Sequence, residues 1–166
     1  MNLLGIDVGG TGIKGAIINT VTGQLVTDRK RLSTPQPANP QLIIETIVEL
    51  VRFFDWKKEI GCGFPSVIQK GVVRTASNID GQWIGLNAAD LLTEASGCPT
   101  YVINDADAAG KAEIAFGSGQ CKKGNLIFLT VGTGIGSALF HERRLYPNTE
   151  LGFLKIKGRY GEHYAA

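Results

Sequence analysis

The sequence has few of the features that mark secreted, membrane-bound or nucleic-acid-binding proteins. It contains only three cysteines, Cys62, Cys98 and Cys121, an odd number at widely separated positions. Such a set fits neither a disulfide framework nor a zinc site, so we expect a protein of the reducing cytoplasm. A formal net charge of +2 offers no strong electrostatic attraction to nucleic acid or to an anionic membrane.

Long apolar runs are also missing, and we expect no secretory leader. No apolar run approaches the roughly 18 residues that a membrane-spanning helix needs. Residues 1–7 lack a basic start and reach a carboxylate too early for a signal peptide. The 166 residues are 43% hydrophobic and 19% charged, which is typical of one globular domain, or of one domain and part of a second.

Glycine is abundant, with 22 residues, and many of them fall in two short stretches. In one of these, residues 125–131 form an apolar run that leads into Gly132, Thr133, Gly134 and Gly136, and a second apolar run follows. This pattern predicts a strand, a tight turn and a strand. Because glycine has no Cβ, an anionic group could approach the backbone N–H groups, and Thr133 adds a hydroxyl. The alternative is an ordinary glycine hairpin.

The other glycine-rich stretch lies near the start of the chain. An apolar run over residues 3–8 contains Asp7, and residues 9–12 read Gly-Gly-Thr-Gly before a second apolar run that holds Lys14. A carboxylate at a strand end beside such a turn can hold magnesium, directly or through water, next to a phosphate group. Alternatively, Asp7 and Thr11 only shape the turn.

The first 117 residues otherwise alternate strands with helices. Apolar spacing and stop signals predict strands over residues 3–8, 13–18, 24–32, 60–64 and 101–103, and helices over residues 42–54, 87–97 and 106–116. The first three strands, joined by tight turns, should form an antiparallel meander. The alternation predicts an α/β fold whose site lies at the C-terminal strand ends. Asn104 and Asp105 follow the strand over residues 101–103, where they can cap the next helix, carry function, or do both.

The end of the sequence offers little to cover a second sheet. No amphipathic segment of helix length follows the second glycine hairpin, although a sheet that starts at residue 125 needs at least one covered face. We therefore expect the chain to be the front part of a longer two-domain protein, or to complete its core with another chain. Residues 1–117 would form a small N-terminal α/β domain, and residues 118–166 the beginning of a larger one.

Taken together, these motifs resemble the ROK family of sugar kinases. The run Asp7-Val-Gly-Gly-Thr-Gly-Ile-Lys14 is similar to the first phosphate motif of that family, residues 132–136 to the second, and Asn104-Asp105 to its sugar-binding and catalytic pair. Residues 71–85 and 132–152 most resemble bacterial polyphosphate glucokinases. The resemblance implies an actin-like, ribonuclease H-like ATPase fold of the hexokinase–Hsp70–actin superfamily. The chain would hold the N-terminal domain and the start of the second domain.

The resemblance also implies an activity and a set of site residues. The protein would be a cytoplasmic glucokinase, commonly a homodimer in this family, that uses polyphosphate, ATP or both with Mg²⁺. Asp105 would accept the proton of the sugar 6-hydroxyl, and Asn78, Asn104 and Glu150 would bind other hydroxyls of glucose. Asp7 would orient magnesium, directly or through water. The donor phosphates would lie against Gly9, Gly10, Thr11, Lys14, Gly132, Thr133 and Gly134, although Lys14 could also be a solvated surface charge.

One position departs from the family pattern, and two other functions stay open. Phe153 stands where the family usually has histidine, and a phenyl ring cannot make the hydrogen bonds of an imidazole, which bears on sugar affinity or specificity. One alternative is a non-catalytic ROK-like sugar-binding protein. ROK repressors of that kind carry an N-terminal DNA-binding module, whereas we expect the first strand here to begin at Leu3. The other is an inactive fragment. Several basic residues form either a solvated face or a surface that attracts a polyanionic donor: Arg143, Arg144, Lys155, Lys157 and Arg159.

Overall fold

The computed structural model describes residues 1–131 and 134–164 of the chain. These residues divide into two compact units, Met1–Asp105 and Ala106–Ala166, and each unit is described by itself. The division reflects how densely residues contact one another. The domain boundary after residue 117, which concerns the domains of the whole protein, stays a prediction.

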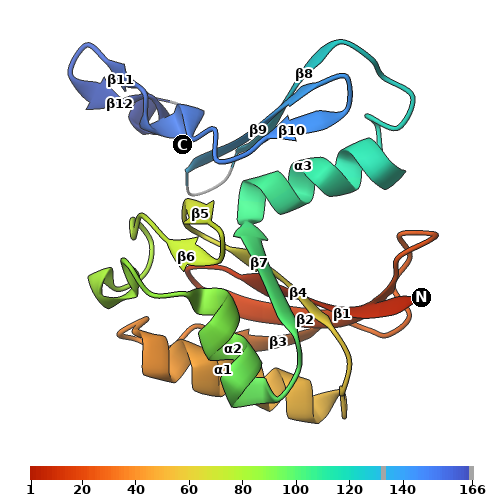
Figure 1. The fold of residues 1–166 in the computed structure, drawn as a ribbon. Helices are drawn as coiled ribbons and strands as arrows, with labels where there is room; N and C mark the ends of the chain where they lie inside the picture. The colour runs from red at the N-terminus through yellow and green to blue at the C-terminus, as the bar shows by residue number, and fades with distance from the viewer. Residues whose placement is uncertain (132–133, 165–166) are drawn as a thin grey trace. The chain divides into compact units, whose positions relative to one another are not determined.

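The first unit is built on a five-stranded sheet with the strand order β3-β2-β1-β4-β7 (Figure 1). Strands β1 (Asn2–Val8), β2 (Gly12–Asn19) and β3 (Lys30–Ser33) form an antiparallel meander. Strand β4 (Ile60–Phe64) pairs parallel with β1, and β7 (Thr100–Asn104) pairs parallel with β4. The predicted meander and the predicted mixture of strands and helices are confirmed.

The third strand is shorter than the sequence pattern predicts. It begins at Lys30 rather than at residue 24, because a side chain interrupts the ladder. The backbone N–H of Ile17 donates to the hydroxyl of Thr27 (3.0 Å), while the carbonyl of Ile17 accepts from Val26 (2.7 Å). A threonine hydroxyl thus replaces the backbone carbonyl that a continuous strand would offer.

Helices α1 (Pro40–Phe53) and α2 (Ala88–Ser96) cover the same face of this sheet (Figure 1). The start of α1 follows the sequence signal, because the side chain of Asn39 accepts from Leu42 N–H at 3.0 Å and Pro40 opens the helix. Helix α2 ends at Gly97, whose φ of 69° is left-handed. The core beneath the helices consists of nearly inaccessible apolar side chains, among them Leu4, Ile13, Ile43, Leu50, Ile60 and Leu92.

A small excursion separates β4 from α2. It contains β5 (Ile68–Gln69), β6 (Val72–Val73) and the short 3-10 helix η1 (Gly81–Trp83). Trp83 is fully buried, meets the ring of Phe64 edge-on at 4.9 Å, and donates its indole N–H to Ala38 O (3.2 Å). Asp80 N–H donates to the same carbonyl oxygen (3.2 Å). These contacts fix the end of the loop that carries Asn78.

The second unit consists of helix α3 (Asp105–Phe116), most of which lies in this unit, and a three-stranded antiparallel sheet with the order β10-β9-β8. The strands are β8 (Asn125–Val131), β9 (Ile135–His141) and β10 (Arg144–Tyr146). Helix α3 packs closely on one face of the sheet, where Ile114 and Phe140 are buried. A Cβ at Gly110 would lie 2.6 Å from the Cβ of Ala138, so glycine permits this approach.

Short elements end the described chain. They are the 3-10 helix η2 (Leu151–Phe153), the hairpin strands β11 (Lys155–Ile156) and β12 (Arg159–Tyr160), and the 3-10 helix η3 (Gly161–Tyr164). Among the described residues, no helix has the length and apolar character needed to cross a membrane.

The opposite face of β8 is open. Its side chains alternate between half-buried and exposed, and Ile127, Leu129 and Val131 are 60%, 54% and 68% exposed. The expectation that the second sheet has little cover therefore holds for one face only. Helix α3 covers the other face, and it precedes the sheet in the sequence instead of following it.

The cysteines provide a test of the packing in both units. Cys62 and Cys98 are buried, whereas Cys121 is exposed, and burial, reinforced by the negative charge of Asp7, raises the pKa of Cys62 to about 12. Because the thiolate is the reactive form, we expect a thiol reagent at about pH 8 to label one cysteine of the folded chain rapidly and all three after unfolding. The variant Cys121→Ser should lose the rapid phase. Rapid labelling of folded Cys121→Ser would contradict the burial of the other two thiols.

Candidate active site

The carboxyl ends of three parallel strands lie at one edge of the first sheet. The strand register pairs Asp7 of β1 with Gly63 of β4, and Gly63 with Ile103 of β7. The glycine turn after β1 and Asp105 after β7 therefore lie at the same edge of the sheet. Strands are about 4.8 Å apart, so β1 and β7, which flank β4, are separated by roughly 10 Å. The two features lie near enough to serve one ligand-binding site.

The glycine turn is tight at one position and open at another. Gly9 N–H donates to Gly12 O (3.1 Å), and a Cβ at Gly9 would lie 3.0 Å from the same oxygen. A Cβ at Gly10 would meet no atom of the described chain within 4 Å. Gly10 and Thr11 are exposed. The turn thus leaves room for an anionic group beside the backbone at Gly10.

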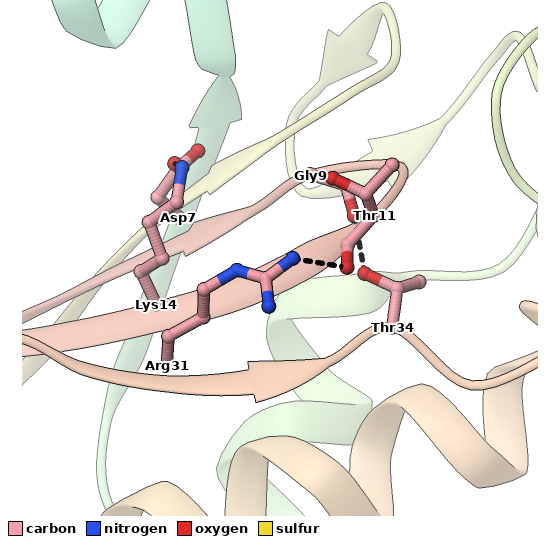
Figure 2. Close-up of polar contacts among 6 residues, drawn as sticks. All are labelled: Asp7, Gly9, Thr11, Lys14, Arg31 and Thr34. Atoms are coloured by element: carbon pink, nitrogen blue, oxygen red, sulfur yellow. Dashed lines mark hydrogen bonds and ion pairs between the residues drawn. The ribbon is translucent and has the colours of Figure 1, made fainter.

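Asp7 and Lys14 are direct partners in the antiparallel register of β1 and β2. The ammonium of Lys14 lies 3.2 Å from Oδ2 of Asp7, and the side chains are 45% and 54% exposed (Figure 2). An exposed pair of this kind contributes about 0–1 kcal/mol to stability. It can therefore separate at little cost when a phosphate group approaches Lys14.

The residues at this edge fit a magnesium ion that water and donor phosphates help to hold. Magnesium usually keeps several waters and takes one or two carboxylates together with substrate phosphates. Asp7 provides one exposed carboxylate beside the glycine turn. Within residues 1–131 and 134–164, no group of three His, Cys, Asp or Glu side chains could form a site made of protein ligands alone.

Asn104 and Asp105 stand at the junction of β7 and α3. Asn104 is 3% exposed, and its amide donates to Ser66 O (3.1 Å), which links the end of β7 to the segment after β4. Asp105 is half-buried and is the first residue of α3. Asn78 is exposed in the loop between β6 and η1. The first unit thus brings Asn104 and Asp105 to the sheet edge that carries the glycine turn.

The other predicted site residues belong to the second unit or lie outside the described residues. Gly132 and Thr133 lie outside them. Gly134 adjoins Glu162, because a Cβ at Gly134 would lie 2.6 Å from its Oε2. A carboxylate therefore neighbours this part of the predicted second phosphate motif. Glu150 is half-buried and precedes η2, where its carbonyl oxygen accepts from Phe153 N–H (3.1 Å).

The side chain of Phe153 has an aromatic neighbour. Its ring meets that of Tyr160 edge-on at 5.6 Å, and Tyr160 meets the imidazole of His163 at 5.8 Å. Packing of this type favours a phenyl ring. The residue that departs from the family pattern is thus part of a small aromatic cluster.

Arg143, one of the basic residues considered for polyanion binding, bonds to backbone carbonyl oxygens. Its guanidinium donates to Ile114 O (2.9 Å), Gly119 O (3.4 Å) and Gln120 O. It therefore satisfies carbonyls at and after the C-terminal turn of α3. The remaining basic residues of that set are exposed: Arg144, Lys155, Lys157 and Arg159.

Sequence analysis missed a buried carboxylate near Glu150. Asp107 is 1% exposed, and its Oδ2 accepts from Asn148 N–H (2.7 Å). Ser137 contacts the same segment. Its hydroxyl accepts from Leu151 N–H (2.9 Å) and donates to Thr149 O. Together these contacts fix the backbone around Glu150. Helical spacing could have revealed Asp107, because it lies three residues before Gly110 and seven before Ile114, on the buried face of α3.

Two further residues, Arg31 and Thr34, contact the glycine turn and were also missed. Figure 2 shows both side chains directed at carbonyl oxygens of the turn. Neither an arginine in β3 nor a threonine directly after it signals such a contact from the sequence.

A family comparison agrees with the motifs and their placement. The ROK family model matches residues 3–152. The chain belongs to the ROK family. The structures it resembles include sugar kinases of the actin-like ATPase fold, so the predicted family and fold class are confirmed.

Individual ROK proteins are similar over nearly all of the chain. The polyphosphate glucokinase of Mycobacterium tuberculosis is 50% identical over 163 residues, which cover 98% of this chain and 62% of that protein. The structure of an inorganic polyphosphate/ATP-glucomannokinase from Arthrobacter sp. strain KM has a TM-score of 0.96 and 44% identity, covering 99% of this chain and 68% of that one. A ROK family glucokinase from Streptomyces griseus, solved in complex with glucose and AMPPNP, has a TM-score of 0.83 and 26% identity. The match covers 94% of this chain and 51% of that one. The chain thus spans 62% of the length of the mycobacterial relative.

Asp107 can be tested through stability. Burial raises the pKa of Asp107, partly offset by the Asn148 N–H and by Lys111. Ionisation of Asp107 therefore favours the unfolded state, and the contribution of Asp107 to the free energy of unfolding falls as the pH rises above about 4. We expect Asp107→Ala to lower the free energy of unfolding by about 1–3 kcal/mol, because Asn148 N–H loses its acceptor. Asp107→Asn keeps an oxygen acceptor without the charge, so it should be less destabilising and should lack the pH dependence.

The measurement is urea unfolding of the wild type and both variants at about pH 5 and pH 8. Equal losses in Asp107→Asn and Asp107→Ala at both pH values would contradict the proposed role of the Asp107 oxygen as an acceptor.

Proposed function

We propose that this protein is a glucokinase that transfers a phosphoryl group from polyphosphate, ATP or both to the 6-hydroxyl of glucose. Relatives of known name support the proposal, since a polyphosphate glucokinase and a polyphosphate/ATP-glucomannokinase are 50% and 44% identical to this chain. The observation that carries it is the placement of the glycine turn and Asp105 at one edge of the sheet, separated by a single strand.

Asp105 is proposed as the general base. Phosphoryl transfer depends mainly on in-line positioning and on neutralising charge on the transferred group. A carboxylate within hydrogen-bond reach of the sugar 6-hydroxyl can accept its proton as the new P–O bond forms and the bond from phosphorus to the bridging oxygen of the donor breaks. The position of Asp105 directly after β7 supports this role, because the pairing of β7 with β4 fixes the backbone up to Asn104.

The donor and sugar are proposed to contact separate groups of residues. The turn at Gly9, Gly10 and Thr11 would offer backbone N–H groups to the donor phosphates, and the ammonium of Lys14 would neutralise part of their charge. Magnesium, held by Asp7, water and the donor, would supply further charge neutralisation when bound. By family resemblance, Gly132, Thr133 and Gly134 would also contact phosphate.

Sugar recognition is proposed for Asn78, Asn104 and Glu150, again by family resemblance. Polar groups of this kind discriminate between sugars, because a missing hydroxyl leaves a buried partner unpaired. The hydrogen bond from the Asn104 amide to Ser66 O (3.1 Å) is consistent with this assignment, because it fixes the orientation of the side chain. From the resemblance alone we also propose a cytoplasmic homodimer without a nucleic-acid partner. The three relatives described above are named as kinases. They therefore give no support to the alternative of a non-catalytic sugar-binding protein.

The base assignment predicts a selective loss of turnover. In Asp105→Asn we expect kcat for glucose phosphorylation to fall by about 10²–10⁴-fold, because general-base catalysis contributes roughly that factor, while the Kd for glucose changes little. Asp55→Asn is a matched control, since Asp55 is an exposed carboxylate that pairs with Lys57. A rate for Asp105→Asn within about threefold of the wild type would rule out a base of this strength.

The donor is tested by measuring initial rates with polyphosphate and with ATP side by side, at saturating glucose and excess magnesium. We expect glucose 6-phosphate to form with at least one of the two donors and its formation to stop when a chelator removes magnesium. Formation of the product with neither donor would contradict the proposed function.

A further inference from the structure

Two side chains from β3 and the residue after it hold the carbonyl oxygens of the glycine turn (Figure 2). Arg31 donates from Nη2 to Thr11 O (2.7 Å), and the hydroxyl of Thr34 donates to Gly9 O (2.5 Å). Thr34 is 8% exposed, so its hydroxyl has a fixed environment. Gly12 leaves space for the guanidinium, because a Cβ at Gly12 would lie 2.6 Å from Cζ of Arg31.

These two hydrogen bonds, together with the backbone N–H of Thr34, which donates to Thr11 O (3.4 Å), direct the N–H groups of the turn. In a trans peptide, the C=O and N–H bonds of one plane point in opposite directions. Because Gly9 O is directed at Thr34, the N–H of Gly10 is directed away from that residue. Because Thr11 O is directed at Arg31, the N–H of Gly12 is directed away from β3. Such N–H groups are the donors that an anion-binding turn presents to its ligand.

Arg31 also adds positive charge beside the turn. It is the direct register partner of Lys14 in the antiparallel pair of β2 and β3, and Lys14 is the partner of Asp7. Direct partners in an antiparallel sheet lie on the same face. Two cations and one carboxylate therefore form a row across three strands next to residues 9–12.

We propose that Arg31 and Thr34 are positioning residues for the phosphoryl donor. They hold the carbonyl oxygens of Gly9 and Thr11 toward β3, which keeps the N–H groups of Gly10 and Gly12 available to donor phosphates. The positive charge of Arg31 adds to that of Lys14 at the same place. This proposal rests on the proposed kinase function, because it assumes that the turn binds the donor.

The test combines three variants that break these contacts in different ways. Thr34→Val removes the hydroxyl at nearly constant shape, Arg31→Gln removes the guanidinium, and Gly12→Ala displaces the guanidinium without altering Arg31 itself. Thr34→Ser restores a hydroxyl and serves as the rescue variant. Lys30→Gln is the matched control, since it removes a cation from the same strand. The ammonium of Lys30 lies 4.8 Å from the centre of the Phe53 ring.

The measured quantities are the KM for the donor, the KM for glucose, kcat, the melting temperature, and the Kd of inorganic tripolyphosphate with magnesium. We expect Thr34→Val, Arg31→Gln and Gly12→Ala each to raise the donor KM and the tripolyphosphate Kd by about tenfold, which corresponds to ~1.4 kcal/mol. The KM for glucose should stay nearly constant. Thr34→Ser and Lys30→Gln should behave like the wild type.

The outcomes separate this inference from the proposed function. Two results with an active wild type would overturn the positioning role. In one, the three variants keep the donor KM unchanged. In the other, their melting temperature and glucose affinity fall to the same degree as their donor affinity. If the wild type phosphorylates no glucose with either donor, the proposed function fails. Tripolyphosphate binding then tests the positioning role by itself. Weaker binding by the three variants than by the wild type supports the role of these contacts at an anion site, and a wild type that does not bind tripolyphosphate overturns that role.

Discussion

Parallel pairing of β4 with both β1 and β7 is the constraint on which the candidate site depends. It carries the chain from three separate points in the sequence to one edge of the sheet. A glycine turn, the segment after β4 and Asp105 leave the sheet at this edge. The buried core under α1 and α2 fixes the three strands, so the positions of these groups follow from apolar packing. Chemistry at the edge then requires only a few polar residues.

An anion-binding turn must satisfy two opposing demands. Its backbone has to stay open to the ligand, yet its peptide groups need fixed directions. Gly10 meets the first demand, since the space beside it is open. Arg31 and Thr34 meet the second, since their hydrogen bonds hold two carbonyl oxygens toward β3. The second unit contains a comparable arrangement, in which buried Asp107 and Ser137 fix the backbone around Glu150.

Most of the fold follows from local patterns in the sequence. The helix signals at Asn39 and Gly97 and the apolar runs of β1, β4 and β8 predict elements that the structure contains. The strand-end rule also places Asp105 and the glycine turn at one edge. The side-chain contacts that the sequence did not predict join residues far apart in the chain. Arg31 and Thr11 are 20 residues apart, and Asp107 and Asn148 are 41 residues apart. The early part of the predicted third strand was wrong because a single hydroxyl, that of Thr27, replaced a backbone acceptor.

We propose that one edge of the first sheet binds the donor beside Asp105. Nuclear magnetic resonance can locate this site when the paramagnetic ion Mn²⁺ replaces magnesium and is added together with tripolyphosphate. A donor site at this edge predicts strong broadening of the backbone amide signals of residues 7–12 and of Asn104 and Asp105. It predicts little change at the opposite edge, where β2 ends at Asn19 and β7 begins at Thr100. Broadening at Asn19 and Thr100 with unchanged signals at Gly10 and Asp105 would contradict it.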